Sequence, residues 1–130
     1  MRPLLAAFAA LPILAACVSG DDLANRPPAV VFFTDSSALL DGPARAVVAD
    51  TAALANRNPN VPVVVTGYAD PLGPTPMNNA ISAARAEAVA GELRQGGVAP
   101  QRIVTRAAGE VPPPGNLPYP SRRAEIRVGP

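Results

Sequence analysis

The sequence contains no histidine and no lysine, and it has a single cysteine. Missing histidine removes the commonest general base and the commonest metal ligand, so we expect neither a metal nor another cofactor. One cysteine cannot form a disulfide within the chain. All eleven basic residues are arginines, against ten acidic residues. That balance argues against nucleic acid as a partner, because a nucleic-acid surface carries an excess of positive charge.

The first residues predict an export signal. Arg2 precedes an almost wholly apolar run, Leu4 to Leu14, and Leu14-Ala15-Ala16-Cys17 follows directly. The run is far shorter than the ~20 residues that a membrane-spanning helix needs. The Leu-Ala-Ala-Cys sequence resembles the bacterial lipobox, in which the cysteine thiol carries diacylglycerol. The alternative is an ordinary signal peptide cut at Ala-x-Ala, with Cys17 incidental.

The lipobox resemblance implies three regions: a signal peptide at residues 1–16, the lipidated Cys17 with a short linker to residue 28, and one domain at 29–130. Two or more acyl chains, including palmitate, would anchor such a protein stably. Val18 after the cysteine favours the outer membrane over the inner one. The polar linker ends in Pro27-Pro28, and its extended reach is about 35–40 Å at ~3.3–3.6 Å per residue.

The hydrophobic pattern predicts alternating strands and helices. We expect strands at 29–33, 61–68, 102–107 and 123–128. A first helix should run from Asp41, its cap, to residue 56 or 57. A second should run from Asn78 or Asn79 to Gln95, with Ile81, Ala84, Ala88 and Leu93 facing inward, because prolines at 71, 74 and 76 place 70–79 in a loop. The order β-α-β-α-β-β predicts an α+β (or α/β) two-layer sandwich with helices packed on one mixed sheet.

Three polar stretches follow or begin the predicted strands, where sites on such scaffolds gather. They are Phe33-Thr34-Asp35-Ser36, the segment from Gly67 to Ala86, and Arg122-Arg123-Ala124-Glu125-Ile126. The central stretch matches Gly-x-x-Asp-x-x-Gly, four residues, Asn-x-x-Ile-Ser-x-x-Arg-Ala. This signature resembles that of the OmpA-like peptidoglycan-binding domain, as found in peptidoglycan-associated lipoproteins. The resemblance covers residues 30–128. It departs from the family at Ala69, where threonine is usual, and at Ser121, where asparagine is usual.

The resemblance implies a site for diaminopimelate, the stem-peptide amino acid that ends in both an ammonium and a carboxylate. A carboxylate acceptor and an arginine fork a few ångströms apart suit such a zwitterion. By the resemblance, Asp70 and Arg85 are the principal contacts. Supporting candidates are Asn78, Asp35, Arg122 and Arg123.

Each candidate also has a structural interpretation. Asp70 and Arg85 could form an internal salt bridge, and Asn78 could be only a helix cap. Asp35 and Ser36 could close a turn. Arg122 and Arg123 lie on opposite faces of a strand, so at most one is expected in the site.

Three functions follow for testing. The leading hypothesis is a non-catalytic outer-membrane lipoprotein that binds the peptidoglycan stem peptide and tethers the membrane to the wall. The alternative is an interaction module for other envelope proteins, in an export or division assembly. A hydrolase using Asp35, Asp70 or Glu110 is disfavoured, because nothing in the sequence pairs these carboxylates.

Overall fold

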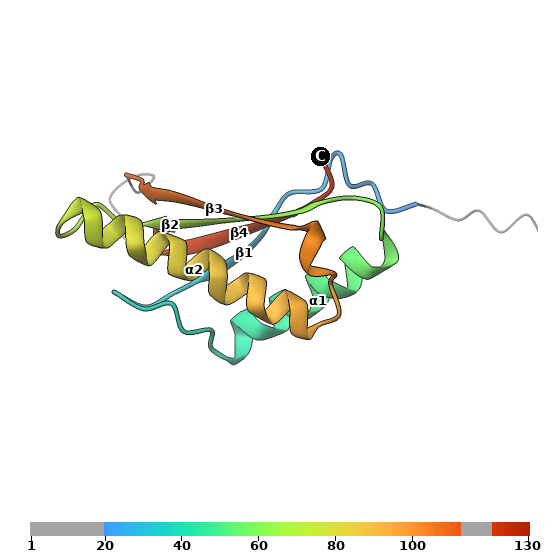
Figure 1. The fold of residues 1–130 in the computed structure, drawn as a ribbon, viewed down its shortest axis with the longest axis horizontal. Helices are drawn as coiled ribbons and strands as arrows, with labels where there is room; N and C mark the ends of the chain where they lie inside the picture. Colours follow the sequence, from blue (N-terminus) through green and yellow to red (C-terminus); the bar gives the residue numbers. More distant parts are fainter. Residues whose placement is uncertain (1–19, 113–120) are drawn as a thin grey trace, which may run out of the picture.

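The computed structural model describes residues 20–112 and 121–130; the predicted signal peptide and Cys17 lie outside them. The elements follow the order β1 (Ala29–Phe32), α1 (Gly42–Arg57), β2 (Val63–Ala69), α2 (Thr75–Gln95), β3 (Ile103–Glu110) and β4 (Arg123–Val128). A short 3-10 turn, Pro100–Arg102, precedes β3. The predicted order and two-layer class are confirmed (Figure 1).

The four strands form one mixed sheet in the order β1-β4-β2-β3. The last strand, β4, lies between β1 and β2 and is antiparallel to both, whereas β2 and β3 are parallel. Both helices cover the same face of the sheet (Figure 1). Along β2, buried residues alternate with half-buried ones. Within the described residues, the sheet therefore has one face against the helices and one face without a second layer.

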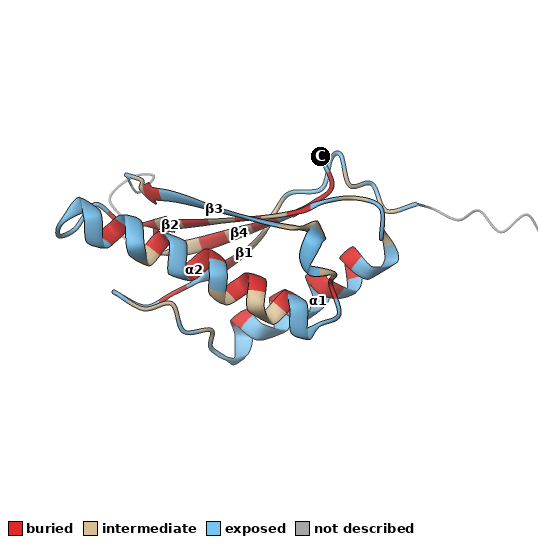
Figure 2. Ribbon diagram, in the orientation of Figure 1, coloured by how far each residue is buried: buried red, intermediate tan, exposed pale blue. Residues whose placement is uncertain are grey.

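The core lies between the sheet and the two helices, where Figure 2 shows buried residues on the facing sides. The first helix begins as predicted, because the Asp41 side chain accepts a hydrogen bond from the Ala44 amide at 2.8 Å. Val48, Leu54 and Ala55 on α1 are buried against the sheet layer. From the sheet, Val31, Val63, Val65 and Ile126 complete this core.

The second helix begins at Thr75, earlier than the sequence predicted. Pro74 is its N-cap residue and Pro76 lies in its first turn, where the missing amide hydrogen costs nothing. Asn78 is therefore inside the helix, and its predicted role as a cap is wrong. The inward face is also different: Ala84 is exposed, while Ser82 and Arg85 are buried.

Close packing of α2 on β2 depends on Gly67. A Cβ atom at this position would lie 1.9 Å from the Ser82 carbonyl oxygen. Any side chain there would push the helix off the strand. The glycine of the signature thus sets how near α2 lies to the end of β2.

Residues 20–28, named here the docked segment, lie against the domain and are not an extended linker. Leu23 packs against the core, and Gly129 lies beside it. The Asn58 amide donates to Asp21 at 2.8 Å, and Arg57 lies 3.6 Å from the same carboxylate. The described part of the predicted linker therefore packs on the domain in part, through Asp21 and Leu23.

The docked segment defines one end of the molecule. It contacts the loop after α1 and the end of β4. At that same end Arg102, the last residue of the 3-10 turn before β3, donates to the Ala55 and Asn58 carbonyls. The start of α2 lies at the opposite end (Figure 1). The 21 residues of α2 separate the two ends by about 32 Å, at ~1.5 Å per residue.

Candidate functional site

A pocket of about 440 Å³ opens at the end of the molecule remote from the docked segment. One wall is the first half of α2, and the others are the loops that follow β1 and β2. The wall from the helix is apolar, and the loops supply most of the polar groups. The lining includes Asp35, Ser36, Asp70, Asn78 and Arg85 together with Leu72, Met77 and Ile81. Two of the three polar stretches of the sequence therefore meet around one cavity.

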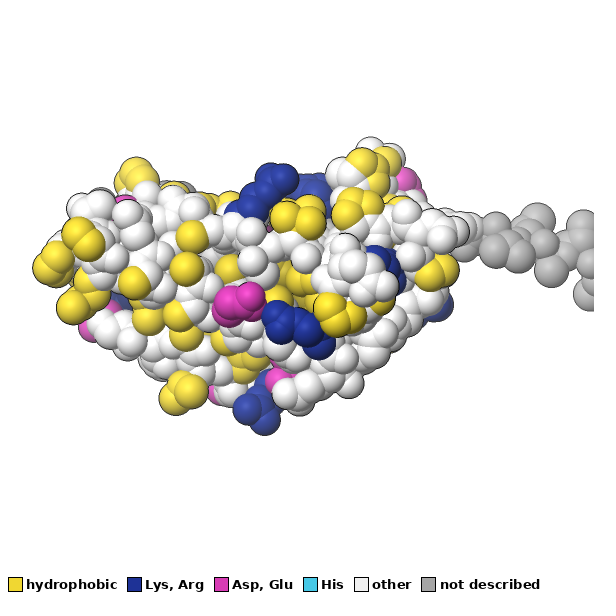
Figure 3. Space-filling view, in the orientation of Figure 1, with side chains coloured by type: hydrophobic (Ala, Val, Ile, Leu, Met, Phe, Trp, Pro, Cys, Tyr) yellow, Lys and Arg dark blue, Asp and Glu magenta, His cyan; other side chains and the backbone are white. Residues whose placement is uncertain are grey.

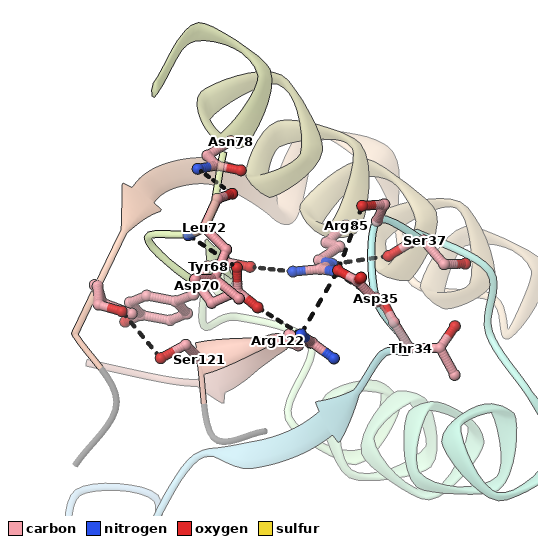
Figure 4. Close-up of polar contacts among 12 residues, drawn as sticks. Thr34, Asp35, Ser37, Tyr68, Asp70, Leu72, Asn78, Arg85, Ser121 and Arg122 are labelled. Atoms are coloured by element: carbon pink, nitrogen blue, oxygen red, sulfur yellow. Dashed lines mark hydrogen bonds and ion pairs between the residues drawn. The ribbon is translucent and has the colours of Figure 1, made fainter. Parts of the chain in front are cut away.

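Asp70 lies at the end of β2 with its carboxylate held from two sides (Figure 4). One oxygen, Oδ1, accepts from the Leu72 amide at 3.2 Å, which is an Asx turn that shapes the loop. The other, Oδ2, accepts from Arg122 Nε at 2.5 Å. An ionised carboxylate accepts about four hydrogen bonds, so Asp70 retains capacity for a ligand ammonium.

Arg85 is the largest side chain that is almost wholly buried, at 1% exposed. Its guanidinium donates to three backbone carbonyls: Nε to Ser37 at 2.8 Å, Nη1 to Tyr68 at 2.9 Å and Nη2 to Thr34 at 3.2 Å. Because the guanidinium has five N–H groups, one on each Nη is left after these bonds. Arg85 thus holds the loop after β1 against the end of β2. It also lines the pocket, where the two remaining N–H groups are its donors.

The charge of Arg85 is partly compensated. Burial lowers the pKa of the guanidinium from its usual value, because the charged form is withdrawn from water. The negative charges of Asp70 and Asp35 oppose this shift, while Arg122 adds to it. The sequence predicted Arg85 as the salt-bridge partner of Asp70, and this is wrong. The Asp70 carboxylate is hydrogen-bonded to Arg122 instead.

Asn78 holds the loop that carries Asp70. Its Nδ2 donates to the Leu72 carbonyl at 3.0 Å and to Glu110 Oε1 at 2.9 Å, and lies 3.5 Å from the Gly73 carbonyl oxygen. Gly73 has a φ of 86°, which favours glycine. The amide of Asn78 therefore acts on the shape of the pocket wall.

Asp35 and Ser36 close a turn, as one interpretation of the sequence predicted. The Ser37 amide donates to the Thr34 carbonyl at 3.3 Å, and Ser36 has a φ of 50°. The Asp35 side chain is 72% exposed, and its Oδ1 lies 3.6 Å from Arg122 Nη2. Asp35 is thus a rim carboxylate, able to move, whereas Asp70 is fixed.

Arg122 directly precedes β4 and Arg123 is its first residue, and the two side chains have different partners, as expected if they lie on opposite sides of the strand. Arg122 contacts both Asp70 and Asp35. Arg123 donates to Glu125 at 2.8 Å and lies 4.1 Å from the centre of the Tyr68 ring. Arg122 does not itself line the pocket but contacts two carboxylates that do, whereas the printed partners of Arg123, Glu125 and Tyr68, are not among the lining residues.

Three residues that the candidate set omitted stabilise this end of the molecule: Glu110, Ser121 and Ser82. Glu110 accepts the hydrogen bond from Asn78, and the buried Ser121 donates to the Val111 carbonyl at 2.9 Å. Ser82, also buried, accepts from the Gly109 amide at 3.1 Å and donates to the Asn79 carbonyl. For Ser82 the sequence did contain a signal. A serine on the inward side of a helix needs a hydrogen-bond partner for its buried hydroxyl.

Within residues 20–112 and 121–130, no three His, Cys, Asp or Glu side chains gather in a way that could hold a metal ion. In the same part of the chain, no helix has the length and apolarity needed to cross a membrane. Asp70, Asp35, Arg85 and Arg122 give the site two negative and two positive side chains. The arrangement can bind a group that carries both charges, with no metal contribution from these residues.

Comparison with known proteins places this geometry in a family. The OmpA family profile matches residues 32–127. Curated protein sequences give no significant match. The fold is similar to that of the peptidoglycan-associated lipoprotein from Burkholderia pseudomallei, with a TM-score of 0.71, 20% identity, and coverage of 85% of this chain and 97% of that one.

Two further solved structures have the same fold. The OmpA-like domain of FopA1 from Francisella tularensis subsp. tularensis SCHU S4 has a TM-score of 0.70 and 24% identity, covering 78% of this chain and 71% of that one. The C-terminal domain of Helicobacter pylori MotB has a TM-score of 0.68 and 19% identity, covering 79% and 85%. At these identities the likeness establishes the fold.

Proposed function

The chain belongs to the OmpA family, and from this premise we propose that it is a non-catalytic outer-membrane lipoprotein that binds peptidoglycan through diaminopimelate. The observation that carries the proposal is the pairing of a fixed carboxylate with two arginines at one pocket. Asp70 is the acceptor for the ligand ammonium. The remaining Nη groups of Arg85, with Arg122, are the donors for the ligand carboxylate.

The charges of the site favour a zwitterion over a simple ion. Two acidic and two basic side chains act on one another here, so a ligand with a single charge would leave one part of the site unmatched. A zwitterion offers a partner to both, and each hydrogen bond to a charged group contributes about 1.5–3 kcal/mol. The apolar wall from α2, with Met77 and Ile81, suits the methylene chain that joins the two ends of diaminopimelate.

The placement of the two ends supports a tether. If Cys17 is lipidated, only two residues separate it from the docked segment that starts at Gly20, so this end of the domain would lie against the membrane. The pocket lies along the first half of α2, from Met77 to Arg85. These residues are 10 to 18 positions before the end of the helix at Gln95, which is about 15–27 Å at ~1.5 Å per residue. In that orientation the pocket would face the wall. The short reach also limits how far the wall can be from the membrane for binding to occur.

The test is co-sedimentation of residues 18–130 with purified sacculi from an organism whose stem peptide contains diaminopimelate. We expect the unchanged chain to pellet, and Asp70→Ala and Arg122→Ala to remain in solution. Glu87→Ala is the matched control, because this carboxylate is exposed on the helix surface, where it pairs with Arg94. If the unchanged chain stays in solution, the peptidoglycan proposal is wrong.

One observation favours an envelope protein as partner instead. Leu72 and Met77 are 63% and 66% exposed beside the pocket, and Figure 3 shows hydrophobic side chains gathered at the end where α2 begins. Exposed apolar groups beside a polar pocket are typical of protein-binding surfaces. Crosslinking in cells that captures one protein through Met77, with no change on Asp70→Ala, would favour this second function.

A further inference from the structure

The end of β3 contacts the segments that carry the pocket's ion pair. Glu110 Oε1 accepts from Asn78 Nδ2 at 2.9 Å. The amide of the next residue, Val111, donates to the Ala69 carbonyl at 2.9 Å, and the Val111 carbonyl accepts from Ser121 Oγ at 2.9 Å. Ala69 precedes Asp70 and Ser121 precedes Arg122 in the chain. Glu110, the last residue of β3, and Val111, which follows it, are therefore hydrogen-bonded to the neighbourhood of both partners of the ion pair.

The contact from Glu110 reaches Asp70 through a short chain of bonds. Asn78 is 7% exposed, and its amide joins Glu110 to the Leu72 carbonyl. The Leu72 amide in turn donates to Asp70 Oδ1. Leu72 is thus held at its carbonyl by Asn78 and at its amide by Asp70. If the Asn78 amide turned away from Leu72, the loop would lose one of the two bonds that shape it.

A register shift brings Glu110 into this position. Gly67 pairs with Ala107, but Ala69 pairs with Glu110, so β3 has one more residue than β2 in this interval. Gly109 within the bulge has a φ of 69°, and a Cβ there would lie 2.4 Å from Asn79 Oδ1. Bulges of this kind redirect a side chain near functional sites. Without the extra residue, Gly109 would be opposite Ala69, and it has no carboxylate.

We propose that Glu110 and Ser121 are positioning residues for the Asp70–Arg122 ion pair. This inference rests on the proposed function and names how its site is held in shape. Neither residue lines the pocket, and we assign to both a positioning role through neighbouring groups. Glu110 acts through Asn78 on the Asp70 loop, and Ser121 acts through Val111 on the approach to Arg122. The structural alternative is that both bonds add only to global stability.

The experiment compares Glu110→Ala, Glu110→Gln and the control Glu87→Ala in the 130-residue chain in detergent. Glutamine keeps an oxygen acceptor for Asn78, whereas alanine removes it. The first readout is hydrogen exchange of the Leu72 amide, which needs no ligand. The second is the affinity for a synthetic stem peptide that ends in diaminopimelate.

We expect Glu110→Ala to accelerate Leu72 exchange and to weaken peptide binding, each by about tenfold, as for a lost bond to a charged group. Glu110→Gln should restore both to within about threefold, and Glu87→Ala should change neither. In an Asp70→Asn background, Glu110→Ala should weaken binding no further, because the two residues act on one contact. As a single change, Ser121→Ala should weaken peptide binding. In an Arg122→Gln background, the same change should weaken binding no further. Glu110→Asp, which withdraws the acceptor by one methylene, replaces Glu110→Ala if that variant does not fold.

The inference is overturned if glutamine is as harmful as alanine, or if Glu110→Ala weakens binding equally with and without Asp70. It is also overturned if Leu72 exchange does not change in Glu110→Ala. Failure of the unchanged chain to bind the peptide would contradict the proposed function alone. In that case the Leu72 exchange still decides whether Glu110 positions the loop.

Discussion

Arg122 Nε donates to Asp70 Oδ2 at 2.5 Å, although the two residues are 52 positions apart in the chain. The pair joins the start of β4 to the end of β2, and both side chains are nearly buried, at 13% and 8% exposed. Removing one partner would leave the other with its charge buried, which is costlier than losing the bond itself. The ion pair is therefore both a structural link and the candidate binding element.

Changing one member of this pair should destabilise the fold more than changing both. We expect Arg122→Gln to lower the free energy of unfolding by about 3 kcal/mol, because Asp70 is left without its charged partner. The double variant Asp70→Asn with Arg122→Gln should recover a large part of that loss. Urea unfolding of the two single variants and the double variant measures the coupling. Strict additivity of the two single effects would contradict a coupled ion pair.

Arg85 should resist conservative replacement. Lysine has a single ammonium and cannot reproduce the planar fork that holds the Ser37, Tyr68 and Thr34 carbonyls together. We expect Arg85→Lys to lower the free energy of unfolding by about 2–4 kcal/mol. Arg94→Lys is the control, since Arg94 is on the surface and pairs only with Glu87. Equal stability of these two lysine variants would show that the carbonyl clamp contributes little.

The environment of the Tyr68 hydroxyl predicts that the folded chain loses stability at alkaline pH. Burial raises the pKa of its hydroxyl above the ordinary value of 10.0, and the negative charge of Glu125 raises it further. A raised pKa in the folded state means that the stabilising contribution is present below about pH 10 and is lost as the pH rises through the folded pKa. We expect the urea midpoint to fall at alkaline pH, and to fall less in Tyr68→Phe.

Tyr119 is the only other tyrosine, so a Tyr119→Phe background isolates the tyrosinate absorbance of Tyr68. In that background the absorbance should titrate at a higher pH in the folded chain than in urea. Coincident titrations in the two states would contradict the role given to burial.

The docked segment should be released by loss of Leu23. This side chain is partly buried against the core, so Leu23→Ala should lower the free energy of unfolding by about 1 kcal/mol, less than a fully buried leucine. Amides of residues 21–25 should exchange faster with solvent. Leu39→Ala is the control, because Leu39 is 84% exposed. Unchanged exchange in Leu23→Ala would mean that the segment is held chiefly by Asp21.

The hydrophobic pattern was sufficient for the element order and for the strands β1 and β4. It failed at the start of α2, where three prolines were interpreted as a loop. A proline in the first turn of a helix loses no hydrogen bond, and Pro76 lies in that turn. Pro43 lies likewise in the first turn of α1, and there the start of the helix was predicted because the capping Asp41 precedes it.

The inward face of α2 could not be read from apolarity alone. Ala84 faces the pocket opening and is exposed, while the polar Ser82 and Arg85 face the sheet. Their burial is possible because carbonyl and amide partners come from segments distant in the chain, such as Thr34, Tyr68 and Gly109. Periodicity records local pattern, and these partners are known only once the fold brings the loops together.

The sequence named residues that line the pocket, but it did not show which of them are hydrogen-bonded to one another. Asp70, Arg85, Asn78 and Asp35 do line one pocket, as the family signature implied. The partner of Asp70 was not predictable, because Arg122 and Arg123 are adjacent in sequence and only the strand direction decides which faces the pocket. The sequence offered Glu110 only as a disfavoured catalytic carboxylate, and its contact with Asn78 depends on the register shift between β2 and β3.

The most direct test of the account is a calorimetric titration of residues 18–130 with two synthetic stem peptides. The peptides differ only in their last residue, diaminopimelate in one and lysine in the other, so they differ by a single carboxylate. The account predicts that the diaminopimelate peptide binds at least about tenfold more tightly, since Arg85 and Arg122 gain a charged partner. It also predicts that Arg122→Gln abolishes the difference. Equal affinity for the two peptides would contradict recognition of a zwitterion by this pocket.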